Sequence, residues 1–346
     1  MKRLVSLLLA ASLISSLAFF SSCAREKQFS KTDITVFDTQ TIILGCEESE
    51  AEFDKNADRM ISLLSEYHKL FDIYYEYDGI NNLKTVNDNA GKAPVAVDGR
   101  VIEMLLFAKE MYTLSEGKVN VAMGSVLSVW HKYREAGLDD PENAVLPTME
   151  ELQEAALHTD INKVIIDEEN GTVFLEDEKM SLDVGAIAKG WSVEAVADIM
   201  ESEGLTGYAM SVGGNVRCMG KKPWGDRWEI GIQNPDLTSA KAYSATVYLE
   251  REALVTSGTY QRFYTVDEKQ YHHIIDPKTL MPSEHFASVS VIIEDSGKGD
   301  ALSTALFNMS EKEGRALCER LGAEALWVYN DQSTKSTAGF EKLTEN

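Results

Sequence analysis

The segment that decides the fold of this chain is DVGAIAKG at residues 183–190, which joins a predicted strand to a predicted helix. Gly185 lets the backbone approach a ligand closely, and the first turn of a helix offers unpaired N–H groups to an anion. Lys189 adds a positive charge suited to a phosphate. Asp183 would repel a phosphate, so it is better suited to accept a hydrogen bond from a ring N–H or a sugar hydroxyl. The same residues also fit an ordinary strand-to-helix turn, and the segment alone does not decide between these readings.

On both sides of this segment, apolar periodicity predicts helices mixed with strands rather than regular βαβ repeats. Asn170-Gly171, between two short apolar runs, is the strongest hairpin signal in the chain. We therefore expect an α+β fold with mixed or antiparallel sheets and flanking helices. The predicted helices cover 54–71, 101–115, 149–157, 189–203, 300–309 and 311–321, with a segment at 119–133 that begins extended and turns helical and a loop at 134–147. The predicted strands cover 34–44, 164–166, 172–175, 180–184, 208–212, 228–233, 244–249, 270–275, 287–293 and 325–329.

The first residues resemble an export signal. A short basic start is followed by an apolar run at 4–20 and then by Ser-Ser and Cys23. This layout predicts a lipoprotein signal peptide at 1–22 with lipidation of Cys23; an ordinary signal peptide or an uncleaved helix is the alternative. Polar residues then predict a tether over 23–33, followed by a single domain over 34–346. The protein is thus expected in the cell envelope, anchored by lipid on the outer side of the cytoplasmic membrane.

Charge and cysteine content exclude several classes of protein. The formal net charge of −23 argues against a nucleic-acid partner, because phosphates need Lys and Arg to neutralise them. Cys46, Cys218 and Cys318 form no CxxC pair, which argues against a cysteine zinc site and a disulfide framework.

Two further motifs carry candidate chemistry. Asp300 and Thr304 are four residues apart at the expected start of a helix, and a carboxylate with a hydroxyl on one face forms part of a magnesium shell. Taken alone, the pair is more typical of a helix cap with a solvent-facing threonine. His272 and His273 are adjacent near a strand end, so at most one faces a given site. Such a histidine suits a general base, although a packed histidine is the commoner case.

Taken together and in order, these motifs resemble the ApbE family of flavin transferases. The blocks that carry the resemblance are FDT at 37–39, Asn87, Trp130, DVGAIAKG at 183–190, VGGN at 212–215, TSGTYQRF at 256–263, HHIIDPKT at 272–279 and DALSTALF at 300–307. Two stretches depart from the family pattern. EGKVN at 116–120 stands where the family commonly has Gly-Gly-x-Phe-Asp, and Thr279-Leu280 stands where it has Thr-Gly.

The resemblance implies a T-fold-related architecture, FAD as substrate and Mg²⁺ as cofactor. It implies that His273 is the base, with Asp276 in the same catalytic group. The implied metal ligands are Asp300, Thr304 and the carbonyl of Ala186, with Ser303 beside them. The implied FAD contacts are Phe37, Tyr74, Lys118, Val119, Asn120, Asp183, Lys189 and Ile275.

The implied reaction is Mg²⁺-dependent transfer of FMN from FAD to a threonine or serine hydroxyl of an acceptor protein, with release of AMP. Acceptors of the family carry an Asp-x-Ser/Thr-Gly-Ala-Ser/Thr type of segment, often on membrane-associated electron-transfer proteins. Two alternatives keep the same residues: an FAD pyrophosphatase that uses water as the acceptor, and a non-catalytic flavin-binding lipoprotein.

Overall fold

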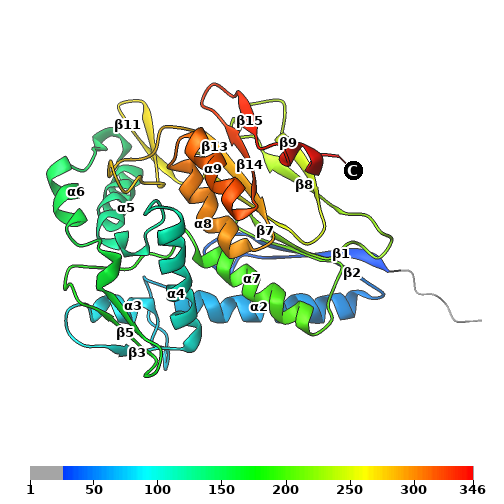
Figure 1. The fold of residues 1–346 in the computed structure, drawn as a ribbon, viewed down its shortest axis with the longest axis horizontal. Helices are drawn as coiled ribbons and strands as arrows, with labels where there is room; N and C mark the ends of the chain where they lie inside the picture. Colours follow the sequence, from blue (N-terminus) through cyan, green and yellow to red (C-terminus); the bar gives the residue numbers. More distant parts are fainter. Residues whose placement is uncertain (1–25, 346) are drawn as a thin grey trace, which may run out of the picture.

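One eight-stranded antiparallel sheet organises the chain (Figure 1), for which the computed structural model describes residues 26–345. Strands from both ends of the sequence meet in this sheet. Other elements cover its middle strands on both faces. β13 shows the consequence, since all six of its residues are buried. The spatial order is β1 (Lys27–Asp33), β2 (Thr41–Glu47), β6 (Tyr208–Val212), β7 (Asn215–Met219), β10 (Ala253–Gly258), β13 (Ser288–Ile293), β14 (Glu324–Val328) and β15 (Thr334–Ser336).

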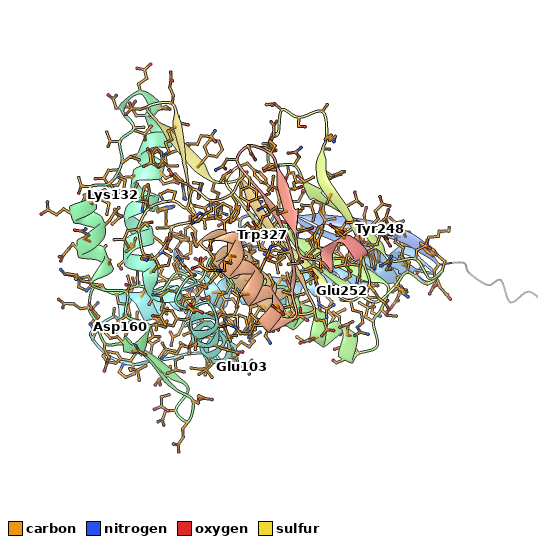
Figure 2. All side chains as sticks on the ribbon, turned by 45° about the horizontal axis from the view of Figure 1, so that its top comes forward. Glu103, Lys132, Asp160, Tyr248, Glu252 and Trp327 are labelled. Atoms are coloured by element: carbon orange, nitrogen blue, oxygen red, sulfur yellow. The ribbon has the colours of Figure 1, made fainter. Side chains whose placement is uncertain are left out.

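Helices cover one face of this sheet. α2 (Glu50–Phe71) packs on β1 and β2, α7 (Ala188–Ser202) on β6 and β7, and α8 (Ser296–Phe307) on β10 and β13. Ten of the twelve residues of α8 are buried, as expected for a helix enclosed by other elements. α9 (Glu311–Leu321) lies over β14, where the Trp327 side chain is fully buried beneath it (Figure 2).

The opposite face of the sheet carries a smaller layer. β8 (Trp228–Gln233) and β9 (Tyr243–Leu249) form a separate two-stranded sheet, and α10 (Phe340–Leu343) lies beside it. Trp228 and Ile232 of β8 are buried with residues of the main sheet in a second apolar cluster. The eight-stranded sheet therefore lies between two apolar cores.

A lobe beside the sheet holds the remaining elements, at the left of Figure 1. It contains α3 (Leu83–Asp88), α4 (Gly99–Leu114), α5 (Gly124–Asp139), α6 (Met149–Ala156), the three-stranded sheet of β3 (Val95–Ala96), β5 (Thr172–Leu175) and β4 (Val164–Asp167), and the hairpin of β11 (Phe263–Val266) and β12 (Lys269–His272). Three short 3-10 helices, Val121–Met123, Pro141–Asn143 and Ile161–Lys163, connect these elements.

The α+β class, the antiparallel pairing and the hairpin at 170–171 are confirmed. The strand predicted at 180–184 is wrong, although its apolar residues alternate. Its backbone bonds other partners: Leu182 N donates to Asn87 Oδ1 at 2.7 Å, and Asp183 N donates to Val121 O at 2.8 Å. The loop predicted at 134–147 is wrong over its first six residues, which belong to α5.

The amino-terminal boundaries also differ from the prediction. Residues 27–33, assigned to the tether, form β1 and pair along their whole length with β2, whereas 34–40 form a loop rather than a strand. Cys23 and the predicted signal peptide at 1–22 lie outside the described residues. Within the described part, no helix is long and apolar enough to cross a membrane.

The helix predicted at 300–309 begins earlier, at Ser296, with Asp295 as its cap. Asp300 is therefore inside α8, where it meets the first turn of α7. A Cβ atom on Gly190 would lie 2.3 Å from Ser296 O and 2.5 Å from Asp300 Cβ, so only glycine allows this approach. The start of α8 is also held by Glu194 of α7, whose Oε2 accepts from Ser296 N at 2.6 Å.

Gly190→Ala should therefore push α7 away from α8 and lower the free energy of unfolding by about 1–3 kcal/mol, the usual cost of overpacking a core. Thermal unfolding of the two proteins measures this. Gly99→Ala is the matched control, because a Cβ at that helical position meets nothing within 4 Å. Equal stability of Gly190→Ala and the wild type would contradict the packing described here.

Candidate active site

The carboxylate of Asp300 lies buried at the contact between α7 and α8. Its Oδ2 accepts from Gly190 N at 2.9 Å and lies 3.8 Å from Lys189 Nζ. Gly190 is in the first turn of α7, whose own N-cap residue Ile187 provides no side-chain hydrogen bond. Asp300 thus satisfies a free N–H group at this helix end. Burial raises the pKa of Asp300, against the opposing effects of Lys189 and the Gly190 N–H.

Asn215 supplies a second buried oxygen at this place. Its side chain lowers the pKa of the neighbouring Asp300 carboxyl, and the residue is 1% exposed. Its Oδ1 is buried and has no hydrogen-bond partner among the described residues. An oxygen that no donor satisfies, beside a buried carboxylate, is the kind of environment that a hard cation stabilises. The residues present therefore fit Mg²⁺.

The other expected metal ligands differ in their exposure to solvent and in their hydrogen bonds. Thr304 is partly exposed one turn after Asp300 on α8, and Ala186 is partly exposed just before α7. Ser303 is fully buried, and its hydroxyl donates to Asp300 O at 2.9 Å and pairs with Ser257 Oγ at 2.8 Å. Ser303 therefore joins α8 to β10. In the described part of the chain, His, Cys, Asp and Glu side chains form no group of three that could hold a metal, so backbone, hydroxyl and amide oxygens would have to complete the shell.

Asp183 and Lys189 hold the loop before α7. Gly185 N donates to Asp183 Oδ1 at 2.9 Å, and Lys189 Nζ donates to Gly185 O at 3.2 Å. Burial raises the pKa of Asp183, while His131, Arg262 and Lys189 act in the opposite direction. Lys189 thus lies between the loop and Asp300, which places its ammonium group beside the buried carboxylate.

The two adjacent histidines have different surroundings, as strand alternation requires. His272 is buried, with Nε2 at 2.7 Å from Ser283 O and Nδ1 accepting from Ile274 N, so both of its ring nitrogens are occupied. His273 is partly exposed, with Nδ1 at 3.2 Å from Arg262 O. No hydrogen bond reaches its Nε2 from the described residues. Burial, with the charge of Arg262, lowers the pKa of His273 to about 3, so its imidazole is neutral at physiological pH.

Arg262 is a site residue that the sequence did not single out, although it lies in the quoted TSGTYQRF block. Its side chain is exposed and makes no ion pair within the described residues. Its positive charge adds to the effect of burial in lowering the pKa of His273, and it opposes the rise that burial causes in the pKa of Asp183 and of Tyr74, three groups from separate segments. Arg262 therefore lies among them. Asn215 was also missed as a site residue, although it ends the VGGN block quoted for the family resemblance.

The two loops that carry Tyr74 and Phe37 both contact His68. Tyr74 is 54% exposed, and its ring centroid is 5.7 Å from that of His131. Phe37 adopts a positive φ of 54° and donates from N to His68 Nδ1 at 3.2 Å. His68 Nε2 in turn lies 3.3 Å from the Tyr77 hydroxyl in the Tyr74 loop. The Phe37 and Tyr74 loops are therefore connected through His68 and Tyr77.

The remaining predicted residues support the lobe. Lys118 Nζ pairs with both carboxylate oxygens of Asp276, at 3.1 and 3.2 Å, and Lys278 N donates to Oδ1. In the described residues, no hydrogen bond joins Asp276 to a histidine. Asn120 caps the turn at Val121–Met123 and donates to Thr159 O. Val119 and Ile275 are buried apolar residues. These contacts hold the 118–120 segment against the turn that follows His273.

A model of the ApbE family matches residues 31–327 of the chain. The chain belongs to the ApbE family. It is 29% identical to the FAD:protein FMN transferase of Haemophilus influenzae, over 100% of this chain and 99% of the relative. It is 30% identical to a Klebsiella pneumoniae protein of the same name, over 79% of this chain and 81% of that one.

Solved structures of ApbE proteins share the fold. The ApbE protein of Thermotoga maritima superposes with a TM-score of 0.81 at 25% identity, covering 92% of this chain and 100% of that one. The flavin transferase ApbE of Vibrio cholerae gives 0.76 at 25% identity, covering 92% and 99%. The ApbE architecture expected from the sequence is thereby confirmed.

In this ApbE-family chain, Mg²⁺ should stabilise the wild type against thermal unfolding, because a cation would neutralise the Asp300 carboxylate and satisfy Asn215 Oδ1. The gain should grow by about 1.4 kcal/mol for each tenfold rise in ion concentration above Kd. Asp300→Asn should lose this gain, whereas Asp198→Asn, on the exposed side of α7, should keep it. A melting temperature of Asp300→Asn that rises with Mg²⁺ as in the wild type would rule out the metal site.

Proposed function

We propose that the chain is an FAD:protein FMN transferase, which moves the FMN part of FAD to a threonine or serine hydroxyl of an acceptor protein and releases AMP. The observation that carries this proposal is the pairing of a buried oxygen site, Asp300 with Asn215, and a neutral His273 with a free Nε2. Family membership, and relatives named for this activity, support the same reaction.

Asp300, Thr304 and the Ala186 carbonyl would hold Mg²⁺, with Ser303 beside them. The ion would neutralise the diphosphate and stabilise the charge on departing AMP. Lys189, beside Asp300, would bind the phosphates from the α7 side. Asp183 would accept from the flavin or its ribityl chain, and Phe37 and Tyr74 would pack against the rings. Lys118, Val119, Asn120 and Ile275 would line the nucleotide site through the lobe.

His273 would act as the base. Its Nδ1–H donates to Arg262 O, which leaves the Nε2 lone pair free to accept a proton. As the acceptor hydroxyl attacks the FMN phosphorus, its proton passes to Nε2. A new P–O bond forms to the acceptor, and the P–O bond to AMP breaks. Asp276 would keep the turn after His273 in place through its ion pair with Lys118.

The same residues would allow water in place of the acceptor, which defines the alternative of an Mg²⁺-dependent FAD pyrophosphatase. A non-catalytic flavin-binding lipoprotein would have no need of the free His273 Nε2.

We also propose that Cys23 is lipidated and anchors the enzyme on the outer side of the cytoplasmic membrane. The signal-like sequence at 1–22 supports this. Because β1 begins at Lys27, only residues 24–26 separate Cys23 from the sheet. An anchored enzyme would thus lie close to the membrane surface and to membrane-associated acceptors.

Incubation with FAD, Mg²⁺ and a purified acceptor domain should add FMN to an acceptor threonine or serine, seen by mass spectrometry, with one AMP released per FMN attached. His273→Gln should lose at least about a hundredfold in rate, since a general base contributes roughly 10²–10⁴. FAD binding, followed by fluorescence, should persist in that variant. Release of free FMN and AMP without any labelled acceptor would support the pyrophosphatase instead.

The pH profile should depend on Arg262. His273 must be neutral to act as a base, and burial together with the charges of Arg262, His272 and Lys189 lowers its pKa to about 3. Protonation of His273 should therefore reduce activity only as the pH falls toward that value. Arg262→Gln should raise the pKa of His273 and move this acid limb to higher pH, while Arg262→Lys should leave it nearly in place. An identical acid limb in the wild type and Arg262→Gln would contradict the placement of the guanidinium group.

A further inference from the structure

A groove of about 460 Å³ runs along the line where the β8–β9 hairpin packs against the main sheet, on the face opposite α7 and α8. Its walls come from β2, β6, β7 and β10 on one side and from the hairpin on the other. Figure 2 marks the hairpin with Tyr248 of β9. None of the residues proposed to bind FAD or Mg²⁺ lines it. The proposed reaction therefore leaves this groove without a role.

The groove ends beside the candidate active site. Three pairs of consecutive residues connect the two: in each pair the first residue lines the groove and the second belongs to the site or contacts it. These pairs are Gly214 and Asn215, Thr256 and Ser257, and Gln261 and Arg262. Thr256 and Ser257 are neighbours within β10 and so face opposite sides of the sheet, whereas Gly214 and Gln261 lie in the connections beyond the strand ends. The groove and the site therefore lie on opposite faces and approach each other around these ends.

The hairpin side of the groove follows a free strand edge. All six residues of β8, from Trp228 to Gln233, line it, whereas β9 contributes only Tyr243. Successive side chains of a strand point to opposite faces. Because every residue of β8 lines the groove, the groove runs along the backbone of β8 and not over one of its faces. β9 occupies one edge of β8, and no other strand in the described residues pairs with its second edge. Unpaired N–H and C=O groups are a template for an added strand.

The side chains that line the groove indicate which class of ligand fits it. Glu229 is the only charged residue among those that line the groove, and no Lys or Arg is there to hold a phosphate. Apolar, aromatic and uncharged polar side chains, such as Ile230, Tyr260 and Gln233, make up the rest. An extended, mostly uncharged polypeptide fits these walls, and a nucleotide does not. A reaction on a protein hydroxyl requires such a polypeptide site next to the base.

We propose that this groove binds the acceptor polypeptide as an extended segment paired with the free edge of β8, and directs its hydroxyl residue to His273. This inference rests on the proposed FMN transfer to a protein. Gln261 ends the groove one residue before Arg262, whose carbonyl holds His273. A segment leaving the groove at that end reaches the base directly.

The test measures binding of a fluorescent peptide, Asp-Ala-Thr-Gly-Ala-Thr, to the FAD-loaded enzyme by anisotropy, and FMN attachment to it by mass spectrometry. Ser211→Phe fills the groove from β6, and Ser244→Phe on β9 is its matched control outside the groove. Gln261→Trp and Gln270→Trp form a second pair of exposed positions, one inside the groove and one outside.

Ser211→Phe and Gln261→Trp should each weaken peptide binding at least about tenfold, the effect of losing one or two hydrogen bonds. Both controls should bind as the wild type, and all four variants should keep the wild-type affinity for FAD. A peptide with proline in place of both alanines should bind more weakly, because proline has no N–H group to donate to a paired strand.

Several results would overturn the proposal: no binding of the peptide by the wild type, equal binding by the groove variants, or a loss of FAD affinity in those variants. A change of oligomeric state with unchanged peptide binding would assign the groove to a second copy of the chain. Peptide binding that depends on the groove without any FMN attachment would instead refute the proposed transfer and leave the groove's role as a peptide site intact.

Discussion

The hydrogen bond from Gly190 N to the buried carboxylate of Asp300 is the constraint on which the site depends. α7 begins without a side-chain cap of its own, and its first turn is packed against α8 rather than exposed to water. A carboxylate from the neighbouring helix satisfies the free N–H group and the positive end of the helix dipole. The close approach of α7 and α8 requires glycine at position 190, because any Cβ there would clash with α8. The packing of the two helices therefore fixes the position of the Asp300 carboxylate.

This packing divides the site into a rigid half and a loop half. Glu194 binds both Ser296 N and the Arg217 side chain, which locks α7, α8 and β7 together around Asp300 and Asn215. His273 and Arg262, in contrast, lie at or beside the β11–β12 hairpin, and Tyr74 lies in a surface loop. Rigid elements suit the part that positions a phosphate, since misplacement by about 1 Å is costly in rate. Loops suit the part where a second protein must enter and leave.

Local patterns explain which parts of the fold were predictable. The hairpin at 170–171 and the long helices depend on turn chemistry and periodicity within one segment, and both were found. Residues 180–184 alternate like a strand, yet Asn87, almost a hundred residues away, takes the backbone bonds that a neighbouring strand would provide. The start of α8 was missed because glycines follow Asp295, which obscures its cap. Arg262 and Asn215 belong to the site only through residues that are distant in the sequence, and no spacing in the sequence reveals such neighbours.

The charges of the site are ones that a divalent cation would balance. The chain as a whole carries a formal charge of −23, so an anionic nucleotide approaches a repulsive surface. Within the site, the carboxylates of Asp183 and Asp300 are opposed by Lys189 and Arg262, which leaves the local charge near zero. A diphosphate adds about two negative charges beside carboxylates whose pKa values burial already raises, and buried charge of one sign is costly. A divalent cation would restore the balance beside the buried oxygens of Asp300 and Asn215. Lys189, held by Gly185 and Asp300, is too constrained to do this alone.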